Sequence, residues 1–160
     1  MRRLTFAACI MLTACTGGSE TPAPPLLPSD PCALLTIHDV ESATGSRVIR
    51  SGLVPESKMI VPTDPKPCRY VTNGRDASIY VSVDPHGAAT FARYRDRDPV
   101  NDLAIKGVGD EAFVQGLATL WVRVGGGYFA VSTQHGAGPS AVEPLKKLAE
   151  AALSHTSTAS

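Results

Sequence analysis

The sequence has no excess of charge of either sign. It contains 15 Lys and Arg residues against 15 Asp and Glu residues, so the formal net charge is zero at neutral pH. A domain that binds nucleic acid carries a basic patch or stripe that neutralises phosphates, and no such cluster occurs along this chain. We therefore expect no nucleic-acid partner.

The chain also lacks the spacings that mark metal and catalytic sites. No histidine belongs to an H-x-H or H-E-x-x-H pattern, and the four of them are scattered: His38, His86, His135 and His155. There is no G-x-S-x-G nucleophile elbow, and a triad of Ser132, His135 and a distant Asp would have to be assembled in space. We predict no metal, no cofactor and no identifiable catalytic residue.

Two short motifs resemble ligand-binding loops but favour structural turns. The segment GVGDEAF, residues 107–113, does not have the glycine spacing of a phosphate loop, and its two carboxylates would repel phosphate. Asp84 and His86 in the segment DPHG could hold a cation, yet this composition is also typical of a turn from a strand into a helix. We expect a turn at both places.

Long apolar runs are missing as well. The apolar stretch from Leu4 to Leu12 would rise about 14 Å as a helix, against about 30 Å for the hydrocarbon core of a bilayer. Two arginines precede it and small residues follow it up to Cys15, which is the order of a secretory signal. Residues 1–14 are therefore predicted to be a signal peptide.

The segment LTAC, residues 12–15, resembles the lipobox of bacterial lipoproteins, in which a leucine stands three positions before a cysteine. The resemblance implies a diacylglyceryl thioether on Cys15, cleavage before this residue and acylation of the new amine. Two or more acyl chains give stable attachment to a membrane. The alternatives are an ordinary secreted protein that is cleaved nearby, or an incidental cysteine.

The remaining cysteines form an even pair. Cys9 leaves with the signal and Cys15 carries lipid, so Cys32 and Cys68 are left in an exported chain. Such a pair predicts a disulfide. The alternative is a metal site with two cysteine ligands, but it needs further ligands, and no histidine lies near either cysteine in the sequence.

Composition divides the chain after the signal into a tether, one domain and a tail. Residues 15–29 begin with the lipidated cysteine and are rich in Pro, Gly, Ser and Thr, without apolar periodicity, which is typical of a tether. Residues 30–153 are long enough for one domain and one core. Residues 154–160 are predicted to be a flexible tail.

Helix signals frame the predicted domain. Asp30 can cap a first helical turn, and Thr36 with Asp39 forms a capping box for a second helix, which Gly45 ends. Another helix is expected at 88–95. Near the C-terminus, apolar side chains at helical spacing form one stripe: Leu145, Leu148, Ala149 and Ala152.

Strand signals fill the rest of the domain. A strand is expected at 47–49, and residues 50–67 are interpreted mainly as a loop that holds at most one short strand at 59–61. Asn73-Gly74 suits a two-residue hairpin turn. That turn places Tyr70 opposite Ala77 and Cys68 opposite Ile79, with Tyr70 and Cys68 pointing into the core.

A second hairpin is predicted at Gly125-Gly126, and it places Arg123 opposite Tyr128 and Trp121 opposite Ala130. The face of the sheet away from the core then carries a candidate binding surface of Tyr80, Trp121, Arg123 and Tyr128, with Ser132 and Gln134 beside them. Aromatic side chains with a few polar groups suit a binding patch. The alternatives are a face covered by a helix or an ordinary solvated sheet.

Together these elements predict an α+β domain, with an antiparallel sheet of about five to six strands, helices packed mainly on one face and one disulfide. The segments DPCALLT, CRY and GVGDEAF, the alternating strands and LKKLAEAAL are similar to the actinobacterial cell-envelope lipoproteins grouped as the domain-of-unknown-function 3558 family, over roughly residues 29–153. The resemblance implies a disulfide between Cys32 and Cys68 and an exported, lipid-anchored domain. It implies no catalytic residues.

The leading functional hypothesis is a lipid-anchored binding or interaction module on the outer face of the cytoplasmic membrane. Its partner is expected to be an envelope lipid, glycan or protein. One alternative is an envelope hydrolase or transferase with a spatially assembled active site. The other is a purely structural envelope lipoprotein.

Overall fold

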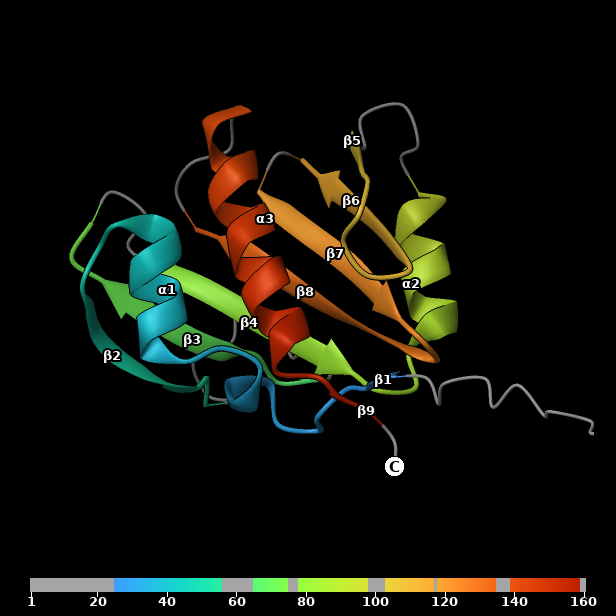
Figure 1. Cartoon of the computed structure of the whole chain (residues 1–160), viewed down its shortest axis with the longest axis horizontal. Helices are drawn as coiled ribbons and strands as arrows, with labels where there is room; N and C mark the ends of the chain where they lie inside the picture. The colour runs from blue at the N-terminus through green and yellow to red at the C-terminus, as the bar shows by residue number, and fades with distance from the viewer. Residues whose placement is uncertain are drawn as a thin grey trace, which may run out of the picture.

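The computed structural model describes residues 25–55, 65–74, 78–97, 103–116, 118–134 and 139–158. The predicted signal peptide, Cys15, most of the tether, the expected strand at 59–61 and His135 lie outside the described residues. The described part is built around one antiparallel sheet of seven strands with helices on both faces (Figure 1). The α+β prediction is confirmed.

The sheet has one strand more than the upper end of the expected range. In spatial order its strands are β2 (Val48–Leu53), β3 (Cys68–Thr72), β4 (Ser78–Asp84), β8 (Gly127–Thr133), β7 (Thr119–Val124), β6 (Glu111–Gln115) and β5 (Leu103–Ile105). The edge strand β5 was not expected, since three residues are too few to show an alternating pattern. Strand β2 is also longer than predicted, because 50–53 belong to it and not to the following loop.

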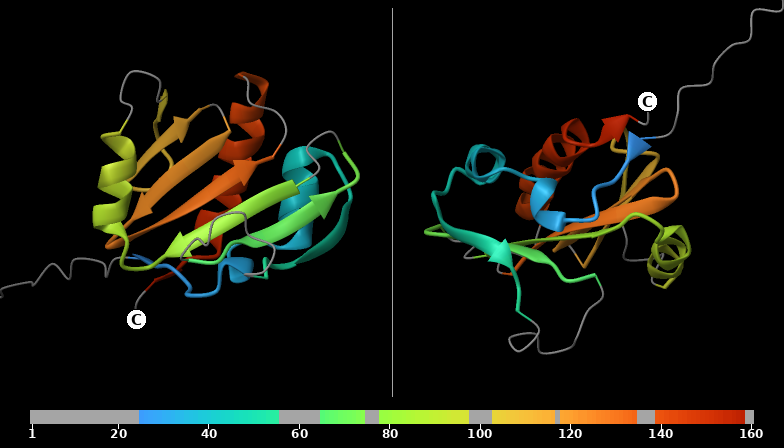
Figure 2. Two further views of the ribbon diagram at one scale, coloured as in Figure 1. Left: turned by 180° about the vertical axis from the view of Figure 1, so that it is seen from behind. Right: turned by 90° about the horizontal axis from the view of Figure 1, so that it is seen from below.

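Two helices cover one face of this sheet and a third covers part of the other. The helices α1 (Ile37–Thr44) and α3 (Pro139–Ser154) contact each other on the first face. The helix α2 (Ala88–Arg95) lies on the opposite face, as the view from below in Figure 2 shows. The helices are therefore mainly, but not only, on one face. The position of α2 determines which part of the second face is covered.

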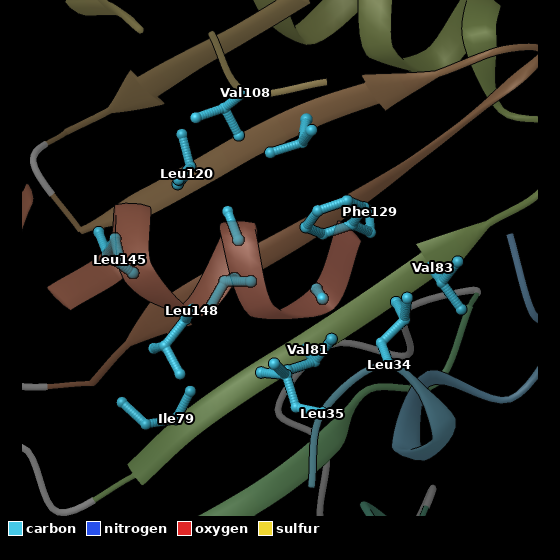
Figure 3. Close-up of a cluster of buried hydrophobic side chains, with 14 of the residues drawn as sticks. Leu34, Leu35, Ile79, Val81, Val83, Val108, Leu120, Phe129, Leu145 and Leu148 are labelled. Atoms are coloured by element: carbon cyan, nitrogen blue, oxygen red, sulfur yellow. The ribbon is translucent and has the colours of Figure 1, made fainter. Parts of the chain in front are cut away.

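The main core lies between the sheet and α3. All four residues of the predicted stripe are fully buried on α3, where they meet inward-facing side chains of β4, β7 and β8 such as Val81, Leu120 and Phe129 (Figure 3). Each fully buried Leu, Val or Phe side chain in this core contributes about 1.5 to 3 kcal/mol of transfer free energy. The contact with α3 buries the core face over the middle of the sheet, and side chains just before α1 and on α1 extend the same core.

The α1 helix begins and ends as its sequence predicts. The Thr36 hydroxyl accepts a hydrogen bond from the backbone N–H of Asp39, and the Asp39 carboxylate accepts one from the backbone N–H of Thr36 at 2.7 Å. Gly45 ends the helix in the left-handed conformation with φ of 66°. Asp39 also contacts the ring of His155 at 3.0 Å, which joins α1 to the end of α3.

Cys32 and Cys68 form the predicted disulfide, with their Cα atoms 5.1 Å apart. The bond joins a short 3-10 helix, η1 (Pro31–Ala33), to the start of β3, and Cys68 is fully buried. Beside it the hydroxyl of Tyr70 donates a hydrogen bond to the carbonyl of Leu35 at 2.5 Å. Burial, with the negative charges of Asp30 and Asp39, raises the pKa of Tyr70 to about 12.

The hairpin of β7 and β8 has the predicted register. Arg123 faces Tyr128 and Trp121 faces Ala130. The last pair, Val124 and Gly127, leaves Gly125-Gly126 as the two-residue turn that the sequence predicts.

The register predicted for β3 and β4 is wrong by two residues. Tyr70 faces Ile79 instead of Ala77, and Cys68 faces Val81 instead of Ile79. The physical reason lies in Asn73, whose side chain accepts a hydrogen bond from the backbone of Arg47 instead of shaping a two-residue turn. A shift of two keeps every side chain on its predicted face, so Cys68 and Tyr70 still point into the core.

The two ends of the described chain meet in a small ladder. Strand β1 (Pro25–Leu26) pairs with β9 (Ser157–Thr158) in an antiparallel two-stranded sheet. The first of these segments belongs to the predicted tether and the second to the predicted tail. Within the described ranges, no helix is long and apolar enough to cross a membrane.

Candidate functional site

The four residues of the predicted binding surface do lie on one face of the sheet. Strand register places Tyr80, Trp121, Arg123 and Tyr128 on the face away from α1 and α3. The structure nevertheless divides this face into two parts. The helix α2 covers the part over β6, β7 and the start of β8, whereas none of the described helices covers the part over β3 and β4 on that side (Figure 2).

The covered part is a second, aromatic core. Phe91 on α2 meets Phe113 on β6 with ring centroids 5.3 Å apart, and Tyr94 on α2 stacks on Trp121 at 4.2 Å. Trp121 also contacts Tyr128 at 5.4 Å, and Tyr128 is only 4% exposed. Trp121 and Tyr128 therefore pack beneath α2, as the alternative of a helix-covered face predicts.

Arg123 is held in a network of charges. Its guanidinium lies 3.4 Å from one oxygen of Glu111 and 3.8 Å from a carboxylate oxygen of Asp110. Arg95 on α2 bonds to the same Glu111 at 3.0 Å and to Asp96 at 2.8 Å. These hydrogen bonds raise the pKa of Arg95 and lower that of Asp96. The charge of Arg123 is thus already compensated within the fold.

The open part of the face is a transverse row of polar side chains. Arg69 on β3 faces Tyr80 on β4, Tyr80 faces Ser132 on β8, and Ser132 faces Thr119 on β7. We call these four residues the polar row. All four are partly exposed. Beyond Thr119 the row meets Gln115, whose amide donates a hydrogen bond to the carbonyl of Tyr94 at 3.4 Å and so marks the border with α2.

Arg69 and Tyr80 contact each other within the polar row. The Nε of Arg69 donates a hydrogen bond to the Ser78 hydroxyl at 3.0 Å, and its guanidinium carbon lies 5.7 Å from the centre of the Tyr80 ring. The Tyr80 hydroxyl donates to the side-chain oxygen of Gln134 at 3.4 Å. The hydrogen bond to Ser78 and the cation–π contact with Tyr80 together orient the guanidinium of Arg69.

Two members of the polar row, Arg69 and Thr119, were not among the site residues predicted from the sequence. A signal for Arg69 was present, because Cys68 and Tyr70 were predicted to point into the core and strand alternation places the residue between them outward. The signal for Thr119 was weaker, since it lies at the first residue of β7.

The motifs interpreted as structural turns are turns. The carboxylate of Asp84 accepts a hydrogen bond from the backbone of His86 at 3.0 Å, in the turn before α2. In GVGDEAF, the carboxylate of Asp110 accepts one from the backbone N–H of Gly125 at 2.7 Å, and Val108 is buried in the main core. Within the described ranges there is no group of three His, Cys, Asp or Glu side chains that could hold a metal ion.

Comparison of the chain with protein-family models, with curated proteins and with solved structures finds no match. The polar row offers a guanidinium, two hydroxyls and a phenol, which donate and accept hydrogen bonds. These groups are suited to hydrogen bonding with a polar ligand.

Proposed function

We propose that this protein is a lipid-anchored binding module of the cell envelope, held by lipid on Cys15 at the outer face of the cytoplasmic membrane. It contacts an envelope lipid, glycan or protein through the polar row. One observation carries the proposal: an aromatic core under α2 covers one part of the second sheet face, while Arg69 and Tyr80 on the other part are partly exposed and contact each other.

Two further features support export and anchoring. The Cys32–Cys68 disulfide is typical of proteins that fold in an oxidising compartment. The segment LTAC at residues 12–15 has the residues of a lipobox, and the arginines and apolar stretch before it have the order of a signal.

The anchor is tested by labelling cells with an alkyne fatty acid. The wild-type chain should carry the label and stay in the membrane fraction, whereas the Cys15→Ser chain should carry none and leave that fraction. A Cys9→Ser chain is the matched control, because Cys9 lies within the predicted signal and should not affect the label. Label that survives Cys15→Ser contradicts the proposal.

The binding surface is tested by photo-crosslinking in the intact envelope. A photoreactive residue in place of Ser132 should capture a discrete partner after illumination. The same residue in place of Lys147, which is exposed on α3 on the other side of the sheet, is the control and should not. Absence of a crosslink at Ser132, or identical products from both positions, would overturn the proposed role of the polar row.

A further inference from the structure

The polar row is periodic. Its four side chains come from four adjacent strands and face one another in register. Neighbouring strands lie about 4.8 Å apart, so the row presents one polar group about every 4.8 Å over a length of about 14 Å. A line of evenly spaced donors and acceptors suits an extended, polar ligand that lies across the strands.

One end of the row is positively charged, and no acid in the part of the chain that the structure describes is paired with it. Arg69 uses its Nε for Ser78, and among the described residues its two terminal nitrogens have no hydrogen-bond or ion-pair partner. Arg50 on β2 is exposed and pairs with Val71, so it lies on the same face, diagonally next to Arg69. The two guanidiniums therefore favour an anionic group, and the planar fork of Arg69 suits a carboxylate or phosphate.

The rest of the row favours a glycan over a protein. Protein interfaces bury aromatic or aliphatic anchors at a desolvated centre. Here Tyr128 is buried under α2, and Trp121 is only partly exposed because Tyr94 of α2 stacks on it. Besides the guanidinium of Arg69, the polar row itself offers hydroxyl and phenol groups, which match the hydroxyl groups of a sugar chain.

We propose that the polar row, together with Arg50, binds a linear acidic glycan whose carboxylate or phosphate groups contact Arg50 and Arg69 and whose sugar hydroxyls contact Tyr80, Ser132 and Thr119. This inference rests on the proposed function, since it names the class of ligand for the same surface.

The test is calorimetric titration of the full, lipidated chain in detergent micelles. The probes are tetragalacturonic acid, which is linear and acidic, and maltotetraose, which has the same length and no charge. Tetragalacturonic acid should bind at least about tenfold more tightly than maltotetraose. Arg50→Ala and Arg69→Ala should each weaken that binding by about tenfold.

Two controls separate recognition from general attraction and from misfolding. Lys147→Ala removes a positive charge from the other side of the sheet and should leave the affinity within about twofold. Arg69→Ala also removes the hydrogen bond to Ser78 and could therefore lower the stability of the fold. Arg50 has no side-chain partner among the described residues, so Arg50→Ala tests the binding without that loss. A tetraglutamate peptide carries the same net charge without the sugar, and equal affinity for it would overturn the glycan in favour of an acidic protein segment.

Inorganic phosphate distinguishes a free anion from a polymer. If phosphate alone competes fully with tetragalacturonic acid at equal concentration, the row is an anion site and the glycan inference is wrong. Binding of neither glycan also overturns it. If neither glycan binds but position 132 still gives a crosslink, the proposed function stands and only the glycan inference fails. If there is neither glycan binding nor a crosslink, both proposals fail.

Discussion

Tyr94 stacks on Trp121 with ring centroids 4.2 Å apart and ring planes inclined by 23°. This contact joins the last turn of α2 to β7 and closes the aromatic core over the second face of the sheet. Because Trp121 is the single tryptophan in the chain, its fluorescence reports on this junction alone.

Replacement of Tyr94 should loosen the end of α2. We expect Tyr94→Ala to lower the free energy of unfolding by about 2 kcal/mol, through lost apolar burial and the lost aromatic pair. The emission maximum of Trp121 should shift to longer wavelength as water reaches the indole. Arg93→Ala, an exposed neighbour on the same helix, should change the stability by less than about 0.5 kcal/mol. An unshifted spectrum in Tyr94→Ala would mean that the stack does not shield Trp121.

Gly87 should tolerate no side chain. A Cβ at this position would lie 2.4 Å from the ring of Tyr128, so Gly87→Ala should destabilise the protein by about 1 to 3 kcal/mol through overpacking at the start of α2. Gly126 lies in the turn nearby, where a Cβ would have no atom within 4 Å, and Gly126→Ala should be close to neutral. Thermal unfolding of the two variants provides the comparison. Equal melting temperatures would show that the ring of Tyr128 moves aside at little cost.

Loss of the disulfide should destabilise the fold strongly. The bond joins residues 36 positions apart, and the chain-entropy relation gives about 4 kcal/mol for a loop of this length. Urea unfolding of the Cys32→Ala/Cys68→Ala chain should show this loss, and a reducing agent should reproduce it in the wild-type chain. A loss below about 1 kcal/mol would indicate that the reduced chain keeps residual structure.

Tyr70 should make the protein sensitive to alkali. Its pKa is raised from 10.0 to about 12 in the folded chain, so the neutral form is favoured by folding. That contribution is complete below about pH 10 and is lost as the pH rises through about 12, because the unfolded chain loses the proton first. Urea unfolding should therefore show a stability that falls over this window. In Tyr70→Phe the fall should be smaller, and a fall as steep as in the wild type would assign it to other groups.

Asp39 should make the stability of the protein sensitive to acid, whereas Tyr70 makes it sensitive to alkali. Burial by itself raises the pKa of Asp39, but hydrogen bonds from Thr36 and from His155 outweigh it and lower the pKa below its ordinary value of 3.8. Because the pKa of Asp39 is lower in the folded chain, its ionisation stabilises the fold at pH values above the pKa of the unfolded chain. This contribution is lost as the pH falls through the pKa of the folded chain.

Asp39→Asn should therefore cost about 1 kcal/mol of stability near neutral pH, as the loss of a helix cap does, and little in acid. Glu143→Gln, at an exposed position of α3, is the control and should be neutral at both pH values. Urea unfolding at neutral and acid pH measures both variants. A cost for Asp39→Asn that does not depend on pH would show that capping geometry matters and the charge does not.

Local patterns were sufficient to predict the elements whose partners lie nearby in the sequence. The capping box of Thr36 and Asp39 and the turn at Gly125-Gly126 involve residues a few positions apart, and both form as predicted. The apolar stripe that includes Leu145 and Leu148 also predicts its own burial, because helical periodicity is visible within one segment.

Contacts between segments that are far apart in the sequence could not be predicted from local patterns. Asn73 and Gly74 have the composition of a tight turn, yet they pack against the connection between α1 and β2. Asn73 accepts a hydrogen bond from Arg47, and a Cβ on Gly74 would lie 2.0 Å from the hydroxyl of Ser46. Nothing local to the turn indicates a neighbour 26 residues away.

The candidate site shows the same limit. Sequence alternation places Tyr80, Trp121, Arg123 and Tyr128 on one face, and this is confirmed. It does not show which side of the sheet α2 covers, since Phe91 and Tyr94 could pack on either face. The outcome buries Tyr128, leaves Trp121 only partly exposed against α2, and brings in Arg69, which is four residues before the misassigned turn at Asn73.

The position of the disulfide also determines how the domain responds to tension on its N-terminus. A pull through residue 25 meets the two-residue ladder of β1 and β9 first, and this ladder has few bonds to break. Seven residues later the load reaches Cys32, where a covalent bond transfers it to β3 inside the sheet. Stretching the N-terminal segment should therefore lengthen it by only a few residues and leave the sheet, with Arg69 next to the bonded cysteine, in place.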